Sequence, residues 1–251
     1  MVRLKSEREI GLLREAGRVA RLALDAAVAA ARAGVRTTDI DAEAERVILS
    51  HGAIPEFKGY QGYPAATCIS VNDEVVHGIP GTRVIREGDL VSIDVGARLH
   101  GYVGDNAATV AIGAVTHAAR GVCDTARQCL ERAILECVPG RRLSDIGRAV
   151  QGHAESRGYS VVRDYAGHGI GARMHEDPTV SNYVDASVLR RDRVLRPGLC
   201  IAIEPMVTAG RPDVRVLGDD WTVVTEDGSV AAHWEDVVAV TEDGPVVLTR
   251  A

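Results

Sequence analysis

The sequence predicts an α+β fold in which antiparallel strands are flanked by two pairs of helices. Apolar residues recur at helical spacing in four segments that come as two pairs, and short apolar runs bounded by turn residues follow each pair. Runs of strands beside helix pairs favour α+β over an alternating parallel arrangement. A pattern of glycine, four residues, isoleucine and a carboxylate also occurs twice, at 88–94 (GDLVSID) and at 198–204 (GLCIAIE).

The first pair of helices is bounded by capping residues. Ser6, with acids in the following turn, predicts the start of a helix that ends at Gly34. Thr38 predicts the N-cap of a second helix, which Gly52 closes. The second pair of helices is expected at about 116–137 and 144–157.

The strands are expected in the apolar segments between these helices. A hairpin is predicted over 90–112 with its turn region at 98–104, whereas residues 55–64, rich in Gly and Tyr, are expected to form a loop. Each copy of the repeated pattern then becomes a turn glycine that feeds a short buried strand with a carboxylate at its far end. Further strands are expected at 67–71, 160–163, 199–203, 221–225, 233–240 and 246–248.

The helix pairs repeat as well as the strands. Segment 34–52 aligns without gaps with segment 140–158, and the two share a glycine, an N-cap residue, an aspartate, an isoleucine and a closing glycine. Both matches come in the same order and at nearly the same offset. We therefore predict one domain, residues 1–251, with internal pseudo-twofold symmetry between halves at about 1–115 and 116–251.

Composition excludes several classes of protein. A net charge of -6 and a pI near 5.8 give little attraction to a phosphate backbone, so no nucleic-acid partner is expected. The five cysteines form no Cys-x-x-Cys pair, which indicates reduced thiols in a cytoplasmic protein and no thiolate zinc site. The sequence has neither a run of about 18 apolar residues nor a signal-like start, so secretion and membrane insertion are not expected.

Carboxylates and histidines form the candidate site. Asp94 and Asp105 lie on consecutive strands of the predicted hairpin, where two aspartates can simply form a surface pair. The apolar run before Asp94 points to burial, which is costly for a carboxylate unless it is paired or binds a metal. With Glu204, Glu235 and a histidine from one of two His-Gly-Ile tripeptides, they could hold two divalent ions that clamp a bridging water, as in hydrolases. From spacing alone, the surface pair and the metal site both stay open.

At these residues the sequence closely resembles the type I methionine aminopeptidases, which are metalloenzymes of the pita-bread (creatinase/aminopeptidase) fold. The resemblance runs over essentially the whole chain. It implies a centre of two divalent ions, Co, Mn, Fe or Zn, and removal of an N-terminal methionine, preferentially before a small residue. It is carried by 59–64 (GYQGYP), 68–80 (CISVNDEVVHGIP), 92–96 (SIDVG), 104–105 (GD), 167–171 (GHGIG), 174–178 (MHEDP), 203–205 (IEP) and Glu235.

The resemblance also implies the role of each site residue. Glu204 would take the proton of the bridging water, which is the nucleophile. His77 would contact the substrate amide or the leaving nitrogen, and His175 would donate to the scissile carbonyl oxygen. The free substrate α-amine would ligate a metal, which restricts cleavage to the terminal residue. All five ligand positions are present, with Asp94 on one metal, His168 and Glu204 on the other, and Asp105 and Glu235 bridging both.

The resemblance further implies a pocket for the methionine side chain, whose apolar and sulfur-containing walls suit a flexible thioether. Without the resemblance, ordinary core packing would be the better explanation for Cys68, Met174 and Trp221. The expected members are Tyr60, Tyr63, Cys68, Met174 and Trp221. The chain departs from the commonest family pattern at Gln61, Val103 and Asp236. Asp236 adds negative charge beside a ligand, which can alter metal affinity.

Two rival functions remain at this point. One is an Xaa-Pro aminopeptidase or a prolidase-like enzyme of the same fold, which usually carries an additional N-terminal domain. The other is a non-catalytic binding module of this fold, in which ligands would be lost. The early first helix and the five surviving ligands favour the methionine enzymes. The expected partners are nascent polypeptides with an N-terminal methionine and, as a second candidate, the ribosome, and we expect a cytoplasmic monomer.

Overall fold

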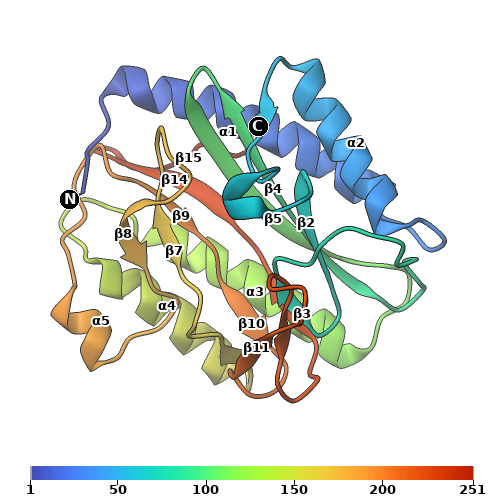
Figure 1. Cartoon of the computed structure of the whole chain (residues 1–251). Coiled ribbons are helices and arrows are strands. Elements are labelled where there is room, and N and C mark those ends of the chain that lie inside the picture. Colours follow the sequence, from blue (N-terminus) through green and yellow to red (C-terminus); the bar gives the residue numbers. More distant parts are fainter. Residues whose placement is uncertain (1, 251) are drawn as a thin grey trace.

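Two pairs of helices pack against short antiparallel sheets (Figure 1). The computed structural model describes residues 2–250. In the first pair, the N-terminal helix packs on the long hairpin and the second helix packs on the first and on two short strands, whereas the second pair packs mainly on strands from the other half of the chain. The helices are α1 (Glu7–Ala30), α2 (Thr37–Ser50), α3 (His117–Leu135), α4 (Leu143–Ser156) and the short α5 (Ala186–Arg190), with a 3-10 turn η1 (Tyr60–Gly62).

The strands form four sheets, and every pairing among the strands named here is antiparallel. Strand β4 is central in one sheet, between β1, β2 and β5, and another sheet has the order β15-β14-β9-β7-β8. In chain order the strands are β1 (Ile54–Pro55), β2 (Thr67–Val71), β3 (Glu74–Val76), β4 (Leu90–Leu99), β5 (Tyr102–Ala111), β6 (Ser160–Val161), β7 (Gly167–Gly169), β8 (Glu176–Val180), β9 (Cys200–Ile203), β10 (Met206–Thr208), β11 (Val214–Val216), β12 (Val223–Thr225), β13 (Ala231–His233), β14 (Asp236–Thr241) and β15 (Gly244–Val247).

Helix α1 begins where Ser6 predicts. The Ser6 hydroxyl accepts from the amide of Glu9 (3.4 Å), and the Glu9 carboxylate accepts from the amide of Ser6 (2.9 Å). This reciprocal capping box satisfies two amides that would otherwise lack an intrahelical partner. The helix ends at Ala30, earlier than predicted, and Gly34 then reverses the chain with a φ of 89°.

Neither Thr38 nor Ser144, the residue aligned with it in the second helix pair, caps its helix, contrary to prediction. Arg36 and Arg142 occupy the N-cap positions, and each pairs in an isolated β-bridge with a distant segment. The Ser144 hydroxyl donates instead to Asp192 (2.9 Å). The tertiary bridges fix where each helix starts, and a local capping signal does not contain that information.

The entries to α2 and α4 use the same hydrogen bonds. The amide of Gly34 donates to the carbonyl of Ile85 (2.9 Å), and the amide of Gly140 donates to the carbonyl of Leu195 (3.1 Å). Two large hydrophobic clusters accompany them, one beneath α1 and α2 and one beneath α3 and α4, and Trp234 packs against both. We propose on these grounds that the chain forms one domain with two pseudo-symmetric halves.

The hairpin and the second half of the chain meet at Ala107 and Glu235. The amide of Ala107 donates to the carbonyl of Glu235 (3.3 Å), and the amide of Glu235 donates to the carbonyl of Ala107 (3.0 Å). The strand predicted at 233–240 is interrupted here, because β13 ends at His233 and β14 begins at Asp236. The break places Glu235 between two sheets.

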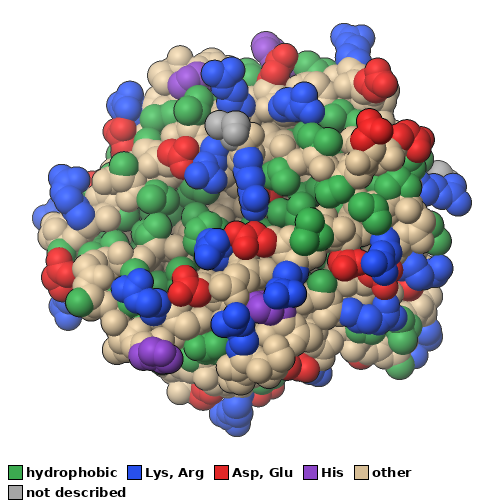
Figure 2. All heavy atoms as spheres, turned by 180° about the vertical axis from the view of Figure 1, so that it is seen from behind, with side chains coloured by type: hydrophobic (Ala, Val, Ile, Leu, Met, Phe, Trp, Pro, Cys, Tyr) green, Lys and Arg blue, Asp and Glu red, His purple; other side chains and the backbone are tan. Residues whose placement is uncertain are grey.

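The surface mixes charges of both signs. On the face shown in Figure 2, basic and acidic side chains are interspersed. Within residues 2–250, none of the helices has both the length and the apolar composition that crossing a membrane requires.

Candidate metal centre and substrate pocket

One cavity of about 230 Å³ gathers every site residue that the sequence predicts. The predicted ligands lie on one part of its wall and the predicted pocket residues on another. Two further side chains, Phe57 and Gln61, complete the lining. The predicted residues that line it are Tyr60, Tyr63, Cys68, His77, Asp94, Asp105, His168, Met174, His175, Glu204, Trp221 and Glu235.

Two of the four carboxylates lie on paired strands of the hairpin, and the other two directly adjoin strands. Asp94 pairs with Cys68 of β2 and with Ala107 of β5, and Asp105 lies two residues before Ala107. Glu204 directly follows β9, as predicted, whereas Asp94 lies in the middle of β4 and not at its end. The prediction for Asp94 was wrong because pairing with β1 and β5 extends β4 to Leu99.

Burial and mutual repulsion dominate the chemistry of these carboxylates. Burial, followed by the charges of neighbouring carboxylates, raises the pKa of Asp94, Glu204 and Glu235 well above the usual range. Burial also raises the pKa of Asp105 to about 7. One oxygen each of Asp94, Asp105 and Glu235 is buried without a hydrogen-bond partner among the described residues. Such a set fits a divalent cation, which would satisfy the oxygens and remove the repulsion.

His168, on β7, presents one ring nitrogen to this cluster. Its Nδ1 lies 3.0 Å from the carbonyl of Gly169, so a proton on Nδ1 is donated there and Nε2 is left with a free lone pair. Nε2 lies 3.7 Å from Oδ2 of Asp105 and 3.6 Å from Oε1 of Glu204. Burial, and then the nearby His175, lower the pKa of His168 to about 4, so the ring is neutral and able to ligate a metal. Ligand atoms of Asp105, His168 and Glu235 all lie within 4.8 Å of one another.

His77 is held in an unusual backbone conformation. Its φ is 60°, and a Cβ on the following Gly78 would lie 2.3 Å from the carbonyl oxygen of Ile69. The glycine is therefore required for the turn that directs the imidazole into the cavity. There the ring packs edge-on against Trp221, with centroids 6.4 Å apart. Burial lowers the pKa of His77 to about 4, so it is neutral at pH 7.

His175 lies in the loop between β7 and β8, beside His168 at a ring-centroid distance of 4.3 Å. The hydroxyl of Tyr60 lies 2.7 Å from Nδ1 of His175. When Tyr60 donates to Nδ1, the imidazole proton resides on Nε2. Burial lowers the pKa of His175. Tyr60 thus contacts a predicted catalytic side chain as well as lining the pocket, a contact that the sequence analysis did not foresee.

The pocket wall is built from aromatic and sulfur-containing side chains. The Tyr63 hydroxyl lies 3.0 Å from the carbonyls of Thr67 and Gly78, and its ring meets Trp221 edge-on at 5.0 Å. Cys68 is buried, which raises the pKa of its thiol and keeps it neutral. A neutral, aromatic and thiol-lined wall favours an apolar or thioether side chain.

Phe57 is a wall residue that the sequence analysis placed only in a loop. A Cβ at Gly96 would lie 2.5 Å from Cε1 of Phe57 and 2.9 Å from Cε of Met174. The missing side chain at Gly96 thus makes room for both wall residues. As the sole phenylalanine of the chain, within the Gly- and Tyr-rich loop, Phe57 could have been singled out from the sequence.

The departures from the family pattern differ in their surroundings. Gln61 lines the cavity with a φ of 48°, whereas Val103 is buried in the apolar cluster behind the cavity wall, together with Met174, and does not line the cavity. Asp236 accepts from Nε of Arg250 (2.8 Å) and from the Thr249 hydroxyl (2.8 Å). The negative charge that Asp236 adds beside Glu235 is therefore paired within the protein.

His233 is a further buried histidine near the centre, predicted from the sequence only as the start of a strand. Its Nε2 is buried without a hydrogen-bond partner among the described residues, 3.8 Å from Oε2 of Glu235. Burial lowers the pKa of His233 to about 3. The signal for it was its position two residues before Glu235, since alternate residues of an extended segment share a face.

Comparisons with known proteins agree with this arrangement. Residues 11–242 match the model of metallopeptidase family M24. Methionine aminopeptidase 1 of Bacillus subtilis is 45% identical over 250 residues, which cover 100% of both chains. Methionine aminopeptidase 1 of Mycobacterium tuberculosis is 45% identical over 252 residues, covering 98% of this chain and 94% of that protein.

Solved structures give the same answer and confirm the α+β pita-bread fold. The methionine aminopeptidase of Thermotoga maritima superposes with a TM-score of 0.96 at 41% identity, covering 100% of both chains. The prolidase of Pyrococcus furiosus matches less well, with a TM-score of 0.78 at 25% identity over 99% of this chain and 65% of that one. The chain belongs to metallopeptidase family M24 and, within it, to the methionine aminopeptidases.

Proposed function

We propose that this methionine aminopeptidase uses two divalent ions to remove the N-terminal methionine of nascent polypeptides, preferentially before a small second residue. The observation that carries the proposal is a cavity in which four crowded carboxylates and a neutral His168 face an apolar, thiol-bearing wall. The carboxylates suit hard divalent cations and the wall suits a thioether. The same cavity therefore accommodates both the metal chemistry and the methionine side chain.

The ligand set leaves the choice among Co, Mn, Fe and Zn open to experiment. When bound, such ions would lower the pKa of a water molecule and polarise the scissile carbonyl group. Asp94 would hold one ion, His168 and Glu204 the other, and Asp105 and Glu235 both.

The remaining roles are proton transfers by this chain's own side chains. We assign to Glu204 the acceptance of a proton from the attacking water, since it faces the cavity at the end of β9. His175 donates from Nε2 to the scissile carbonyl oxygen and stabilises the developing negative charge, with its Nδ1 engaged by Tyr60. His77, neutral at pH 7, contacts the substrate amide or the leaving nitrogen.

Selection for a terminal residue follows from size and charge. The cavity, at about 230 Å³, is smaller than the roughly 300–1,000 Å³ of pockets for drug-sized ligands. It suits one side chain. A free α-amine would meet the carboxylate cluster and ligate a metal, whereas an internal peptide nitrogen has neither the basicity nor the room. The pocket members are assigned as Tyr60, Tyr63, Cys68, Met174 and Trp221.

Cellular context is part of the same proposal. The substrates would be nascent chains that begin with methionine, encountered in the cytoplasm and, as a second candidate partner, at the ribosome, by a monomeric enzyme. All five cysteines are free thiols in the structure, which suits a reducing compartment.

The test is hydrolysis of Met-Ala-Ser, Leu-Ala-Ser and an Xaa-Pro peptide by chelator-stripped protein, alone and with Mn, Fe, Co or Zn added. Release of methionine from Met-Ala-Ser that depends on added metal, with little release of leucine, is expected. Cleavage of the Xaa-Pro peptide without release of methionine would overturn the assignment. Metal titration by calorimetry gives the number of ions bound, and one site instead of two would refute the dinuclear centre.

A further inference from the structure

The loop that carries Met174 and His175 has no regular structure of its own. It connects β7, which ends at Gly169, with β8, which begins at Glu176. Within the loop, the amide of Gly171 donates to the carbonyl of Arg173 (3.1 Å). One backbone hydrogen bond joins the loop to β5, from the amide of Val103 to the carbonyl of Gly171 (3.0 Å). Residues 172–175 have no strand pairing, so their position depends on side-chain contacts.

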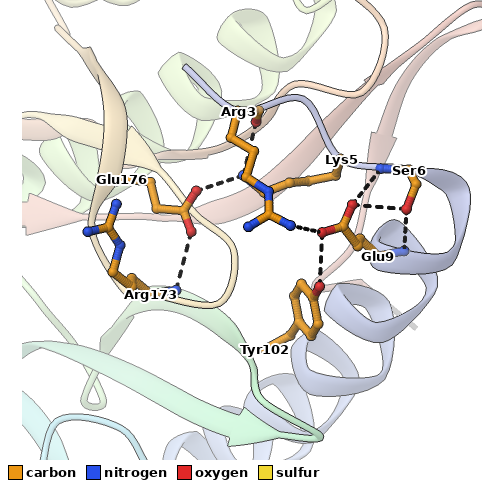
Figure 3. Close-up of polar contacts among 7 residues, drawn as sticks. All are labelled: Arg3, Lys5, Ser6, Glu9, Tyr102, Arg173 and Glu176. Carbon is orange, nitrogen blue, oxygen red and sulfur yellow. Dashed lines mark hydrogen bonds and ion pairs between the residues drawn. The ribbon is translucent and has the colours of Figure 1, made fainter. Parts of the chain in front are cut away.

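A buried ion pair anchors the end of this loop. Lys5 Nζ donates to Oε2 of Glu176 at 2.7 Å, and the two side chains are only 2% and 9% exposed. The other oxygen, Oε1 of Glu176, accepts from the amide of Arg173 (3.3 Å). Figure 3 shows Glu176 between Lys5 and the backbone of Arg173. The carboxylate next to His175 in the chain thus joins the N-terminal segment to the loop.

The pair also fits closely over Gly171. A Cβ at this position would lie 2.5 Å from Oε1 of Glu176 and 2.7 Å from Cε of Lys5. Lys5 is itself fixed, because its Nζ donates to the carbonyl of Arg3 (3.0 Å) and its amide donates to the carbonyl of Gly198 (2.6 Å). Gly198 is the turn glycine before β9, the strand that leads to the proposed base. One lysine therefore contacts both the loop and the start of that strand.

A second ion pair holds the opposite side of the loop. Arg98 Nη1 donates to the carbonyl of Ala172 (2.8 Å), and its Nε donates to Oε2 of Glu56 (2.6 Å). Arg98 lies on β4, four residues beyond Asp94. The loop is thus held between the N-terminal segment and the hairpin, and on the Lys5 side the contact is made to Glu176, which directly follows His175.

We propose that Lys5 and Glu176 are positioning residues, whose buried ion pair holds the 171–175 loop so that His175 faces the reacting carbonyl group. This rests on the proposed role of His175 as a donor. Neither residue lines the cavity, so each acts through the loop and not through contact with substrate. The N-terminal segment before α1 thereby contributes to turnover.

Removal of the ion pair should lower kcat by displacing the loop. Lys5→Met leaves the Glu176 carboxylate buried and unpaired, which forces it to move or to take up a proton. A displacement of about 1 Å at a catalytic group can cost about a hundredfold in rate. We expect Lys5→Met to lower kcat on Met-Ala-Ser at least about tenfold. The double variant Lys5→Met/Glu176→Gln leaves no unpaired buried charge and should also lower kcat. It serves as the test if the single variant does not fold.

Coupling to His175 separates positioning from general destabilisation. In a His175→Ala background there is no imidazole to position, so Lys5→Met should lower the residual kcat by no more than about twofold. The matched control is Asp192→Asn. The Asp192 carboxylate is also buried, forms an ion pair with Arg142 (2.6 Å) and accepts from the amide of Ser144 (3.0 Å). These contacts are made to the start of α4 and not to the cavity. It should lower the thermal midpoint and leave kcat within about twofold in both backgrounds.

Two results overturn the proposal. One is an unchanged kcat for folded Lys5→Met and double-variant protein, and the other is an equal loss of kcat in the wild-type and His175→Ala backgrounds. Failure of the underlying function has a different signature, since His175→Ala would then retain near-normal kcat or wild-type protein would release no methionine.

Discussion

Removing metal should make the stability of this protein fall as pH rises above neutrality. In the metal-free protein, burial and repulsion raise the pKa of Asp94, Glu204 and Glu235 well above the usual range. The native state therefore keeps protons that the unfolded chain has already lost. Since the native state binds more protons, the free energy of unfolding falls with rising pH.

Histidines oppose this effect at lower pH, and their contribution sets the window of the experiment. Burial lowers the pKa of His77 and His168 from 6.5 to about 4 and that of His233 to about 3, and it also lowers the pKa of His175. These groups add stability as pH rises until the unfolded chain has lost its histidine protons, at about pH 7.5. Between about pH 7.5 and about pH 8.5, each carboxyl group that keeps its native proton lowers the free energy of unfolding by roughly 1 kcal/mol.

Urea unfolding of chelator-stripped and Mn-loaded protein at the two ends of this window measures the effect. Metal ligands must be deprotonated, so the loaded protein should not show the fall, and comparison of the two forms cancels groups outside the site. Glu235→Gln removes one of the groups and should reduce the fall in the stripped protein. A stripped protein whose free energy of unfolding is constant or rises across the window would refute the electrostatic description of the cluster.

Three further predictions concern individual side chains. Asp105→Ala should abolish both turnover and the metal binding measured by calorimetry. His175→Ala should bind metal normally and lose turnover. A near-normal kcat for His175→Ala would refute the proposed role of this histidine. Tyr60→Phe, which deletes the hydroxyl 2.7 Å from Nδ1 of His175, should lower kcat about tenfold, and an unchanged kcat would show that the contact has no catalytic role. Glu9→Ala should cost about 1 kcal/mol of stability at pH 7. Hydrogen bonds from the backbone and side chain of Ser6 lower the pKa of Glu9 to about 2 from 4.5. The difference in free energy of unfolding between wild type and Glu9→Ala, measured by urea unfolding, should therefore become smaller as pH falls below 4.5. A difference that stays constant would contradict the capping role.

The composition of the site could be predicted from the sequence because its motifs are long and specific. Each predicted side chain lines one cavity, including Trp221 and Met174, for which core packing was the better explanation before the family was considered. The repeated pattern at 198–204 also predicted correctly that Glu204 directly follows β9. Short-range signals succeeded where the chain itself makes the contact, as at the Ser6 cap.

Long-range contacts could not be predicted in this way. The helix starts at Arg36 and Arg142 depend on β-bridges to distant segments, and the pair of Lys5 and Glu176 joins residues 171 positions apart. No local periodicity or spacing encodes such a partner. The prediction that a strand ends at Asp94 failed for the same reason, because the extension of β4 to Leu99 depends on pairing with other strands.

The bridge between Ala107 and Glu235 gives the bound metal a second consequence. Asp94 and Asp105 belong to the hairpin, whereas Glu235 belongs to the second half of the chain, so ions shared among them would cross-link the halves across this bridge. A cross-link that closes a long loop restricts the unfolded chain strongly. The amides of Ala107 and Glu235 should therefore exchange with solvent more slowly when metal is bound. The exchange rates of these two amides would therefore report whether metal is bound, without any need for substrate.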